Sequence, residues 1–563
     1  MAENPSRQDI LGATGHVLVT GGPGCGKTTI ALQKAMKRID EGLLPGQRVL
    51  FLSFSRAAVA RVVQASRMHM PRKIRESLDV QTFHSFYLML LRSHGYLLGA
   101  PRPLQLLLPQ DEPALRGRGV ADEVWDGRLE KMFLEEGRIA FNLFAPKALE
   151  LLRRCADLRR VVAARYPLIV VDEAQDTGIS QWQCLATLAE ETQLVCLADL
   201  DQQIFDFIKD VSPQRLQDII KELDPLVVDL GAENNRSKGT DILRLGDDIL
   251  TGSLNPPYAG ASMRKFQHVE RDPAIRQAIE DVTEAVTESR GEPPESIAVL
   301  TRTNKGVTAI SRALRGGDHD REIAHEVAMD TNLVALSTRV IAACLEPIYD
   351  PWVTLSTLLS LASEFFRAKG TQGGDNSAAQ LSRYAADADN RKLGAGRQAR
   401  GLKAIVDELA KEPMSGNPQR DWLRVRSLFE GSAAPELQEI ASQVVYLMAV
   451  NRGRLIADSL SGVRTLIGYE RAREVIEAVV VQDMLVNGAE APTGVHVMTI
   501  HKSKGKEFDA VILVHIGHLS TFGQSDEPPR DMARRRLLRV GVTRARYHTR
   551  LLVDQNMDRS LLG

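Results

Sequence analysis

Residues 21–28 read G-G-P-G-C-G-K-T, which fits the phosphate-loop pattern G-x-x-x-x-G-K-[ST]. A short apolar run at residues 16–20 precedes this loop, and residues of helical composition follow it at 29–36. A strand, a glycine loop and a helix in this order direct backbone N–H groups and a helix N-terminus toward an anion. The loop therefore predicts an α/β fold that binds a nucleotide by its phosphates.

The predicted contacts to the nucleotide follow from the chemistry of the loop. Its glycines allow the backbone to approach the phosphates closely. Lys27 can neutralise the β- and γ-phosphates, and the hydroxyl of Thr28 can ligate Mg²⁺. We expect a continuous run of residues to surround the nucleotide: Gly22, Pro23, Gly24, Cys25, Gly26, Lys27, Thr28 and Thr29.

Two carboxylates follow an apolar run further along the chain. Asp172 and Glu173 directly follow the apolar residues 167–171, an arrangement typical of the second half of an ATPase site. We expect Asp172 to hold Mg²⁺ through water and Glu173 to orient and deprotonate the attacking water. The loop alone indicates only that a nucleotide is bound, whereas the loop and the carboxylates together predict hydrolysis.

The next apolar run, residues 193–199, leads to Gln202, Phe205 and Phe207. We expect Gln202 to reach a γ-phosphate while the two aromatic side chains point elsewhere. A residue that senses phosphate beside residues that touch a polymer is the connection that a molecular motor needs.

Composition limits the partners of the chain. Lysine and arginine number 71 against 72 aspartate and glutamate, so a polyanion would have to be held by a local basic channel. The five cysteines lie far apart without a C-x-x-C pair, which argues against a zinc ribbon or an iron–sulfur cluster and favours reduced thiols. No apolar run approaches the length of a membrane span, and no signal core precedes the loop, so we expect a cytoplasmic protein without a membrane partner.

Several basic and aromatic residues keep two interpretations open. Phe54 and Arg56, at the end of the apolar run 48–55, suit a base face and a phosphate backbone. The alternative is that Phe54 belongs to the core and Ser55 caps a helix. Arg236 is a candidate phosphate contact, and the basic stretch 534–546 is either functional or a solvated helix face.

Two long helical regions interrupt the strand signals. Residues 93–165 are helical and charged, and residues 305–492 are mostly helical. Within the second region, the Gly/Ala/polar stretch 369–401 predicts a loop or a linker. Strand signals return at 296–304, 495–500, 510–514 and 550–553.

Taken in order, these stretches resemble superfamily 1A DNA helicases of the UvrD/Rep/PcrA group. The resemblance rests on residues 21–28, 53–59, 82–86, 172–177, 199–205, 234–237, 297–304, 499–508 and 540–545. It implies two RecA-like α/β motor domains, each with a helical insert. The implied boundaries are 1–92 and 166–235 for domain 1A, 93–165 for insert 1B, 236–305 and 490–563 for domain 2A, and 306–489 for insert 2B.

The resemblance also implies roles for single residues. Gln202 senses the γ-phosphate, Arg236 and the arginine-finger candidate Arg544 reach the nucleotide from the far side of the cleft, Glu507 lies near it, and Gln8 reads adenine. The residues that face single-stranded DNA are Phe54, Thr82, Phe83, His84, Phe205, Phe207 and His501.

The chain departs from the family pattern at a few positions. Asn235 stands where the family has an aromatic residue that stacks on adenine, which bears on the preference for ATP over other nucleotides. Phe207-Ile208 replaces a Trp-Arg pair, and Arg539 replaces a tyrosine. Base–aromatic stacking is worth roughly 1–3 kcal/mol per base, so the grip on the strand is expected to be weaker.

The resemblance predicts an ATP-driven single-stranded DNA translocase and helicase that moves 3′→5′ on single-stranded or tailed double-stranded DNA, as in DNA repair. We also expect a compact form without a fused nuclease domain. The alternative is a DNA-sensing ATPase subunit that unwinds little by itself and licenses a nuclease partner, as in Gabija-type antiviral defence. A P-loop kinase or transporter is disfavoured because no kinase lid or transporter signature accompanies the loop.

Overall fold

The fold is taken from a computed structural model. The structure describes residues 7–108, 111–116, 120–199, 212, 214–231, 236–316, 322–327, 331–369, 372–444, 451–485, 493–516 and 528–555. The chain divides into two compact units, each described here by itself. Unit 1 comprises Met1–Leu98, Phe144–Ala328 and Gly488–Gly563, and unit 2 comprises Gly99–Leu143 and Met329–Asn487.

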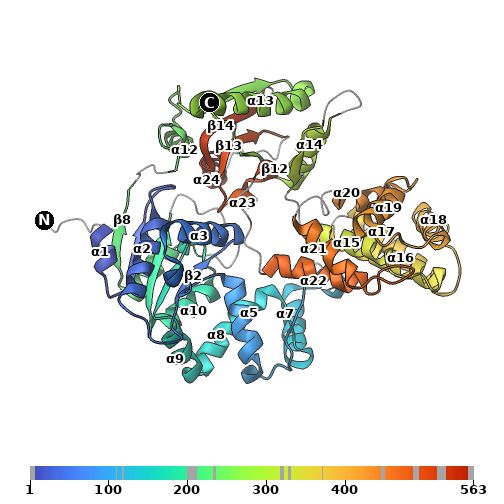
Figure 1. The fold of residues 1–563 in the computed structure, drawn as a ribbon, viewed down its shortest axis with the longest axis horizontal. Coiled ribbons are helices and arrows are strands. Elements are labelled where there is room, and N and C mark those ends of the chain that lie inside the picture. Colours follow the sequence, from blue (N-terminus) through green and yellow to red (C-terminus); the bar gives the residue numbers. More distant parts are fainter. Residues whose placement is uncertain are drawn as a thin grey trace. The chain divides into compact units, whose positions relative to one another are not determined.

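Unit 1 contains two separate sheets (Figure 1). Each has six strands, and all of their ladders are parallel. We call the first sheet and its helices lobe 1. Its strands, in the spatial order β3-β2-β6-β7-β1-β8, are β1 Val17–Thr20, β2 Val49–Ser53, β3 Leu78–Thr82, β6 Leu168–Val171, β7 Gln193–Ala198 and β8 Leu226–Asp229.

The helices of lobe 1 cover its sheet. α2 packs on β2, β6 and β7, and α3 packs on β2 and β3. Because β1, β2, β6 and β7 carry apolar residues on both faces, they read as continuous hydrophobic runs, which is the usual pattern of a covered parallel sheet. The helices are α1 Arg7–Gly12, α2 Lys27–Asp40, α3 Arg56–His69, α4 Arg72–Arg75, α5 Phe83–His94, α8 Phe144–Arg154, α9 Ala156–Arg165, α10 Ile179–Ala189 and α11 Arg215–Leu223.

We call the second sheet and its helices lobe 2. Its strands run in the order β11-β12-β10-β13-β14-β9: β9 Ala261–Phe266, β10 Ser296–Thr301, β11 His325–Val327, β12 Gly494–Thr499, β13 Phe508–Val514 and β14 Ala545–Asp554. Its helices are α12 Ile242–Thr251, α13 Arg271–Arg290, α14 Asn304–Arg315, α23 Ile500–Ser503 and α24 Pro528–Val542. The two sheets confirm the predicted α/β class with two RecA-like lobes.

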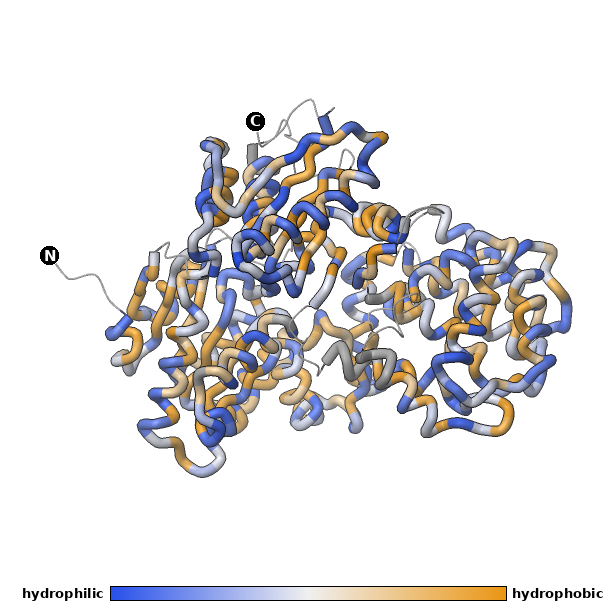
Figure 2. The backbone as a smooth tube through the Cα atoms, turned by 45° about the horizontal axis from the view of Figure 1, so that its top comes forward, coloured by the Kyte–Doolittle hydropathy of each residue, from blue (hydrophilic) through white to orange (hydrophobic). Residues whose placement is uncertain are grey.

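Unit 2 is almost entirely helical. Its one described sheet is the short parallel pair β4 Gln105–Leu106 and β5 Arg138–Ile139. Its helices alternate apolar and polar stretches along their length (Figure 2). The helices between residues 331 and 485 build one core, and Trp125 and Leu129 build a smaller one with Leu107 and Ala140. They are α6 Glu112–Arg116, α7 Asp122–Lys131, α15 Thr331–Ala343, α16 Pro351–Ala368, α17 Gln372–Asp389, α18 Arg397–Lys411, α19 Pro418–Glu430, α20 Pro435–Gln443, α21 Asn451–Ser461 and α22 Ala472–Leu485.

One sequence-based expectation about unit 2 is wrong. The stretch 369–401 contains α17 and the start of α18 rather than a linker. Its small residues Ala378, Ala385 and Ala388 are buried, so they pack in the core and do not mark a flexible chain. Two of its glycines have a packing reason, because a Cβ on Gly394 would lie only 2.2 Å from the ring of Tyr384, and one on Gly396 would meet the same residue.

The units also differ in extent from the implied inserts. α8 and α9 cluster with unit 1 although the first insert was expected to run to residue 165, because α8 packs on α5 and α10. α14 and β11 likewise belong to unit 1, where β11 pairs with β12. β9 and β11 are strands that the sequence pattern did not predict. Among the described helices, none combines the length and the hydropathy that a membrane span requires.

Candidate functional site

The phosphate loop connects β1 to α2 with its glycines in left-handed conformations. Gly24 has φ 80° and Gly26, which caps α2, has φ 94°, so both positions favour glycine. Nζ of Lys27 donates to the carbonyl oxygens of Gly21 at 2.6 Å and Gly22 at 2.8 Å. The ammonium group therefore lies on the loop backbone, within reach of any anion that the loop holds.

Two chain segments contact this loop from outside. A Cβ on Gly24 would lie 2.9 Å from the Cβ of Arg236, so the backbone of Arg236 packs directly on the loop. Nη2 of Arg7 donates to the carbonyl oxygen of Cys25 at 3.0 Å. Arg7 was not singled out from the sequence. Its neighbour Gln8, predicted to read adenine, is exposed on α1.

The other predicted loop contacts divide by burial. Pro23 and Cys25 are buried, so only their backbone groups remain for a ligand. Thr28 is half-buried at the start of α2, and Thr29 is exposed. The loop thus offers backbone N–H groups, one ammonium and one hydroxyl at the N-terminus of a helix, which is an anion-binding arrangement.

The predicted carboxylates stand at the end of β6. Oγ of Ser53, the last residue of β2, donates to Oδ2 of Asp172 at 3.2 Å. Glu173 has φ 53° although it is not a glycine, a conformation that costs of order 1–3 kcal/mol and that is found mostly at functional positions. The strained backbone turns Glu173 out of the strand direction beside Asp172.

Gln175 fixes the carboxylate of Glu173. Its Nε2 donates to Oε2 of Glu173 at 2.6 Å, and its Oε1 accepts from the backbone N–H of Asp199 at 3.2 Å. The amide therefore connects the ends of β6 and β7. The stretch 172–177 was recognised as a motif, but this orienting role of Gln175 was not predicted, because nothing in the sequence shows what the amide faces.

Charges from both lobes act on these carboxylates. Burial alone would raise the pKa of Glu173, but Lys504, Lys27, the hydrogen bond from Gln175 and Arg544 together lower it. Burial and the neighbouring Glu173 raise the pKa of Asp172. Since the charges of Lys27 and Arg544 both reach Glu173, the phosphate loop and the arginine of lobe 2 face the same group.

Three residues of lobe 2 approach lobe 1 at this point. Lys504 pairs with the buried carboxylate of Asp176. Arg539, which replaces the family tyrosine, lies with Nη1 3.9 Å from Oδ1 of Asp199 and Nη2 2.9 Å from Oδ1 of Asp247. Arg544 is only 1% exposed, and burial lowers its pKa, although a guanidinium keeps its charge.

The loop that carries Lys504 packs against lobe 1. Gly505 has φ 79°, and a Cβ there would lie 2.7 Å from Oγ of Ser55. Glu507, two residues further on, forms ion pairs with Arg61 and Arg236. These pairs could not be predicted from the charge composition of the sequence. This stretch of lobe 2, residues 504–507, therefore contacts lobe 1 at three points.

Two of the predicted DNA-facing residues of lobe 1, Phe54 and Phe83, belong to one aromatic cluster. The ring centroids of Phe54 and Phe83 are 4.8 Å apart. Phe83 is only 1% exposed, so its ring is part of the core and supports Phe54 instead of offering a face to a base. Phe54 is half-buried. The sequence alternative for the next position is confirmed, since Oγ of Ser55 accepts from the N–H of Ala58 and caps α3.

The remaining candidates have local structural roles as well. Thr82 caps α5 by accepting from the N–H of Ser85 at 3.1 Å, and His84 lies edge-on to Phe144. Arg56 is half-buried at the start of α3. His501, on α23, has a pKa lowered by burial, by Arg302 and by Lys504. Gln202, Phe205, Phe207 and Asn235 lie outside the described residues.

Apart from the exposed Arg546, the arginines of the basic stretch 534–546 do not form a solvated face. Arg539 and Arg544 are buried, and Arg534, Arg535 and Arg536 are half-buried. Burial of these side chains argues against the solvated helix face and leaves the functional role of the stretch as a prediction.

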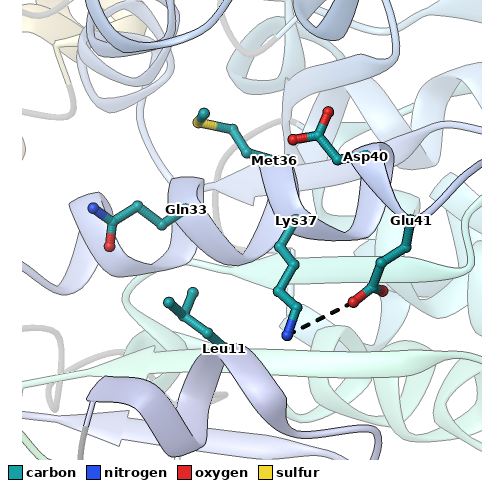
Figure 3. A pocket seen from close by; sticks show the side chains of 6 residues that line it. All are labelled: Leu11, Gln33, Met36, Lys37, Asp40 and Glu41. Atoms are coloured by element: carbon teal, nitrogen blue, oxygen red, sulfur yellow. Dashed lines mark ion pairs between the residues drawn. The ribbon is translucent and has the colours of Figure 1, made fainter.

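A hollow of about 520 Å³ lies elsewhere on lobe 1, along the second half of α2 (Figure 3). Its lining residues include an exposed ion pair between Lys37 and Glu41 at 3.7 Å. None of the predicted nucleotide contacts lines it, because Lys27 and Thr28 stand at the other end of the helix. It is therefore separate from the candidate site.

Comparison with known proteins supports the two-lobe interpretation. Residues 10–208 match the model of an AAA domain, and residues 494–552 match that of a UvrD-like helicase C-terminal domain. The chain is 23% identical to a putative ATP-dependent DNA helicase, YjcD, of Bacillus subtilis, over 96% of this chain and 77% of the relative. It is 23% identical to DNA helicase II of Haemophilus influenzae, over 96% of this chain and 82% of the relative.

A shorter match is to a protein whose name also includes a nuclease. Over 131 residues the chain is 30% identical to an ATP-dependent helicase/nuclease subunit of Pelotomaculum thermopropionicum. The match covers 20% of this chain and 10% of that protein.

Proposed function

Because this chain is a UvrD-like superfamily 1 helicase, an ATP-hydrolysing DNA helicase, we propose that it hydrolyses ATP between its two lobes and moves 3′→5′ along single-stranded DNA. The observation that carries the proposal is the contact of the two lobes beside Glu173, where Lys504 pairs with Asp176 and Arg539 approaches Asp199. Lys504, Lys27 and Arg544 lower the pKa of Glu173 at this place. Those cations keep the Glu173 carboxylate ionised, which is the form that can accept a proton from water beside a triphosphate.

In the proposed cycle, the phosphate loop and Lys27 bind the triphosphate, and Thr28 and Asp172 hold Mg²⁺. The metal would neutralise charge on the β- and γ-phosphates. The residues fit that ion, since Mg²⁺ is usually held by one or two carboxylates plus phosphate oxygens, and a cation would stabilise Asp172, whose pKa is raised by burial.

The hydrolytic step then falls to residues of both lobes. Glu173, oriented by Gln175, takes the proton of the attacking water. Arg236 holds the γ-phosphate of the bound nucleotide, and Arg544 stabilises the charge that develops on it. Gln202 is proposed to sense that phosphate. Loss of the γ-phosphate removes the contacts of both arginines and lets the lobes separate.

Coupling to DNA is proposed to run through the stretch that contains α23. His501, a proposed DNA contact, lies three residues before Lys504 and six before Glu507, both of which bond to lobe 1. A change in lobe spacing therefore acts directly on the DNA-facing residue. Gln8 and Asn235 bear on whether ATP is preferred, and the chain is proposed to act in the cytoplasm.

Strand displacement tests the proposal. Fluorescent duplexes with a 3′ tail, a 5′ tail or blunt ends are incubated with the protein, ATP and Mg²⁺, and ATP hydrolysis is measured in parallel. We expect unwinding of the 3′-tailed duplex and hydrolysis stimulated by single-stranded DNA. Unwinding of the 5′-tailed duplex alone would refute the direction, and hydrolysis indifferent to DNA would refute the motor.

A second candidate is a DNA-sensing ATPase that licenses a nuclease partner. The short match to a helicase/nuclease protein favours it. Affinity purification of the tagged chain from its native cells, followed by the same duplex assay, separates the candidates. DNA-stimulated hydrolysis without unwinding, together with a co-purified nuclease, favours the second.

A further inference from the structure

Glu507 is bonded to three arginines from different parts of unit 1. Nη1 of Arg61, on α3, lies 2.8 Å from Oε1, and Nε of Arg236 donates to the same oxygen at 3.0 Å. Nη2 of Arg546, on β14, donates to Oε2 at 3.3 Å. These cations lower the pKa of Glu507 far enough to outweigh its burial. Two like-charged side chains thus share one carboxylate oxygen.

Backbone packing brings these side chains together. Gly505 lies against Ser55 and Ala58 at the start of α3, and Arg61 follows Ala58 by three residues, on the same face of the helix. Arg236 is held from the other side, where its backbone packs on Gly24 of the phosphate loop. The contact of Gly505 with the start of α3 therefore brings Glu507 next to Arg61.

Arg61 also lies close to the proposed catalytic groups. Its charge is among those that lower the pKa of Asp172 and of Arg544. Nε of Arg61 is buried with no hydrogen-bond partner, whereas Nη1 donates to Glu507. The guanidinium is therefore held by Glu507 and not by polar groups of the lobe 1 interior. Neither the motif pattern nor the family resemblance assigned a role to this residue.

We propose that Arg61 is a positioning residue that acts through Glu507 to control the release of Arg236 to a bound triphosphate. The γ-phosphate and Glu507 compete for the guanidinium of Arg236, which is also fixed by the carbonyl oxygen of Thr543 at 3.0 Å. Because Arg61 occupies the oxygen that Arg236 uses, it weakens the hold of Glu507 on Arg236. The proposal rests on the proposed function, since it needs Arg236 to serve the nucleotide.

Arg61→Met tests the proposal by leaving Oε1 of Glu507 to Arg236 alone. We expect the KM for ATP to rise about 3–10-fold with kcat nearly unchanged, an effect below that of one full hydrogen bond to a charged group. Arg61→Lys keeps the charge and should restore most of the affinity. Arg67→Met is the matched control, because Arg67 is exposed on the same helix.

The decisive comparison repeats Arg61→Met in a Glu507→Gln background. If Arg61 acts through Glu507, its replacement has no further effect on KM there. An equal rise of KM in both backgrounds, or a loss of kcat at saturating ATP, overturns the proposal, because Arg61 would then act on the nucleotide directly.

Equilibrium titration with a fluorescent ATP analogue and circular dichroism of each variant accompany the kinetics. Circular dichroism shows whether a variant is folded, and the titration gives the same comparison where a folded variant has lost turnover. Absence of DNA-stimulated hydrolysis in the unmodified protein would instead refute the proposed function, so the two failures are distinguishable.

Discussion

Lobe 1 and lobe 2 share one architecture, a six-stranded all-parallel sheet, yet they bring opposite charges to the same place. Lobe 1 carries a glycine loop after β1 and the carboxylates Asp172, Glu173 and Asp176 after β6. Lobe 2 places Lys504 after β12, and Arg544 before β14. The loops after parallel strands can carry very different side chains without disturbing the sheet. The same fold can therefore supply the phosphate loop in lobe 1 and the cations in lobe 2.

The difference predicts that each lobe is essential in its own way, and the largest effect should come from the lobe 2 cation. Arg544→Ala should lower ATP turnover by about 10³–10⁵-fold, the range of an arginine finger, while DNA binding persists. Steady-state hydrolysis with saturating single-stranded DNA measures the first, and fluorescence anisotropy measures the second. Arg544→Lys controls for the cavity, because it retains the charge in the same buried position. Near-normal turnover of the alanine variant would reject the assignment.

The lobe 1 counterpart is the carboxylate of Glu173. Glu173→Gln keeps the shape of the side chain but removes the base, so hydrolysis should fall by about 10²–10⁴-fold, the usual range of general base catalysis. The variant should bind ATP at least as tightly as the unmodified chain, because a negative charge near the phosphates is lost. Rapid-quench measurement of a single turnover separates binding from chemistry. A variant that turns over ATP normally would show that another group accepts the proton.

The ion pair between Lys504 and Asp176 should contribute less to ATP hydrolysis than Arg544 and Glu173 do, and more to the stability of the fold. Lys504→Met leaves Asp176 buried without its partner, which typically costs about 3–5 kcal/mol. Urea denaturation measures the loss, and Lys37→Met is the control, because its exposed pair with Glu41 is worth only about 0–1 kcal/mol.

The pH dependence of that loss has a definite sign. Burial raises the pKa of Asp176 to about 7, and removal of Lys504 raises it further. A carboxyl group whose pKa is higher in the folded state stabilises the fold at low pH and loses that contribution as pH rises. The penalty of Lys504→Met should therefore be smaller below pH 7 than above it, and a penalty that grows on acidification would contradict this account.

The smallest effect concerns the DNA-facing side of lobe 1. Phe54→Ala should weaken binding of single-stranded DNA by about 5–150-fold, which corresponds to one stacked base at about 1–3 kcal/mol. At saturating DNA, ATP turnover should remain close to that of the unmodified chain. Phe83→Leu replaces the buried ring that supports Phe54, and it should change DNA affinity little. An equal loss of affinity in both variants would show that the cluster acts only as core.

The sequence predicted the phosphate loop better than the contacts around it, for a physical reason. Phosphate binding needs glycines, a lysine and a threonine next to each other in the chain, so Lys27 and Thr28 are visible as a motif. Gln175 lies within a recognisable stretch, but its hydrogen bonds to Glu173 and Asp199 join two strands and leave no local pattern. Arg61 and Glu507 are 446 positions apart, and only the packing of Gly505 on α3 brings them into contact.

The errors in fold have similar causes. α17 was taken for a linker because alanine and glycine dominate it, yet Ala378, Ala385 and Ala388 are the residues that pack closely in the core. β9 was missed because its sequence, A-S-M-R-K-F, carries polar residues on both faces of an edge strand. Phe83 was expected at a DNA surface on the strength of a motif, and a motif does not say which of two adjacent aromatic rings covers the other.

The central claim is that one chain builds one site from both lobes. It is tested most directly by mixing purified Glu173→Gln and Arg544→Ala proteins and measuring DNA-stimulated ATP hydrolysis over a range of total concentrations. We predict that the mixture hydrolyses no more ATP than the two variants measured separately. Recovery of activity that grows with concentration would contradict the claim, because Arg544 of one molecule would then be serving Glu173 of another.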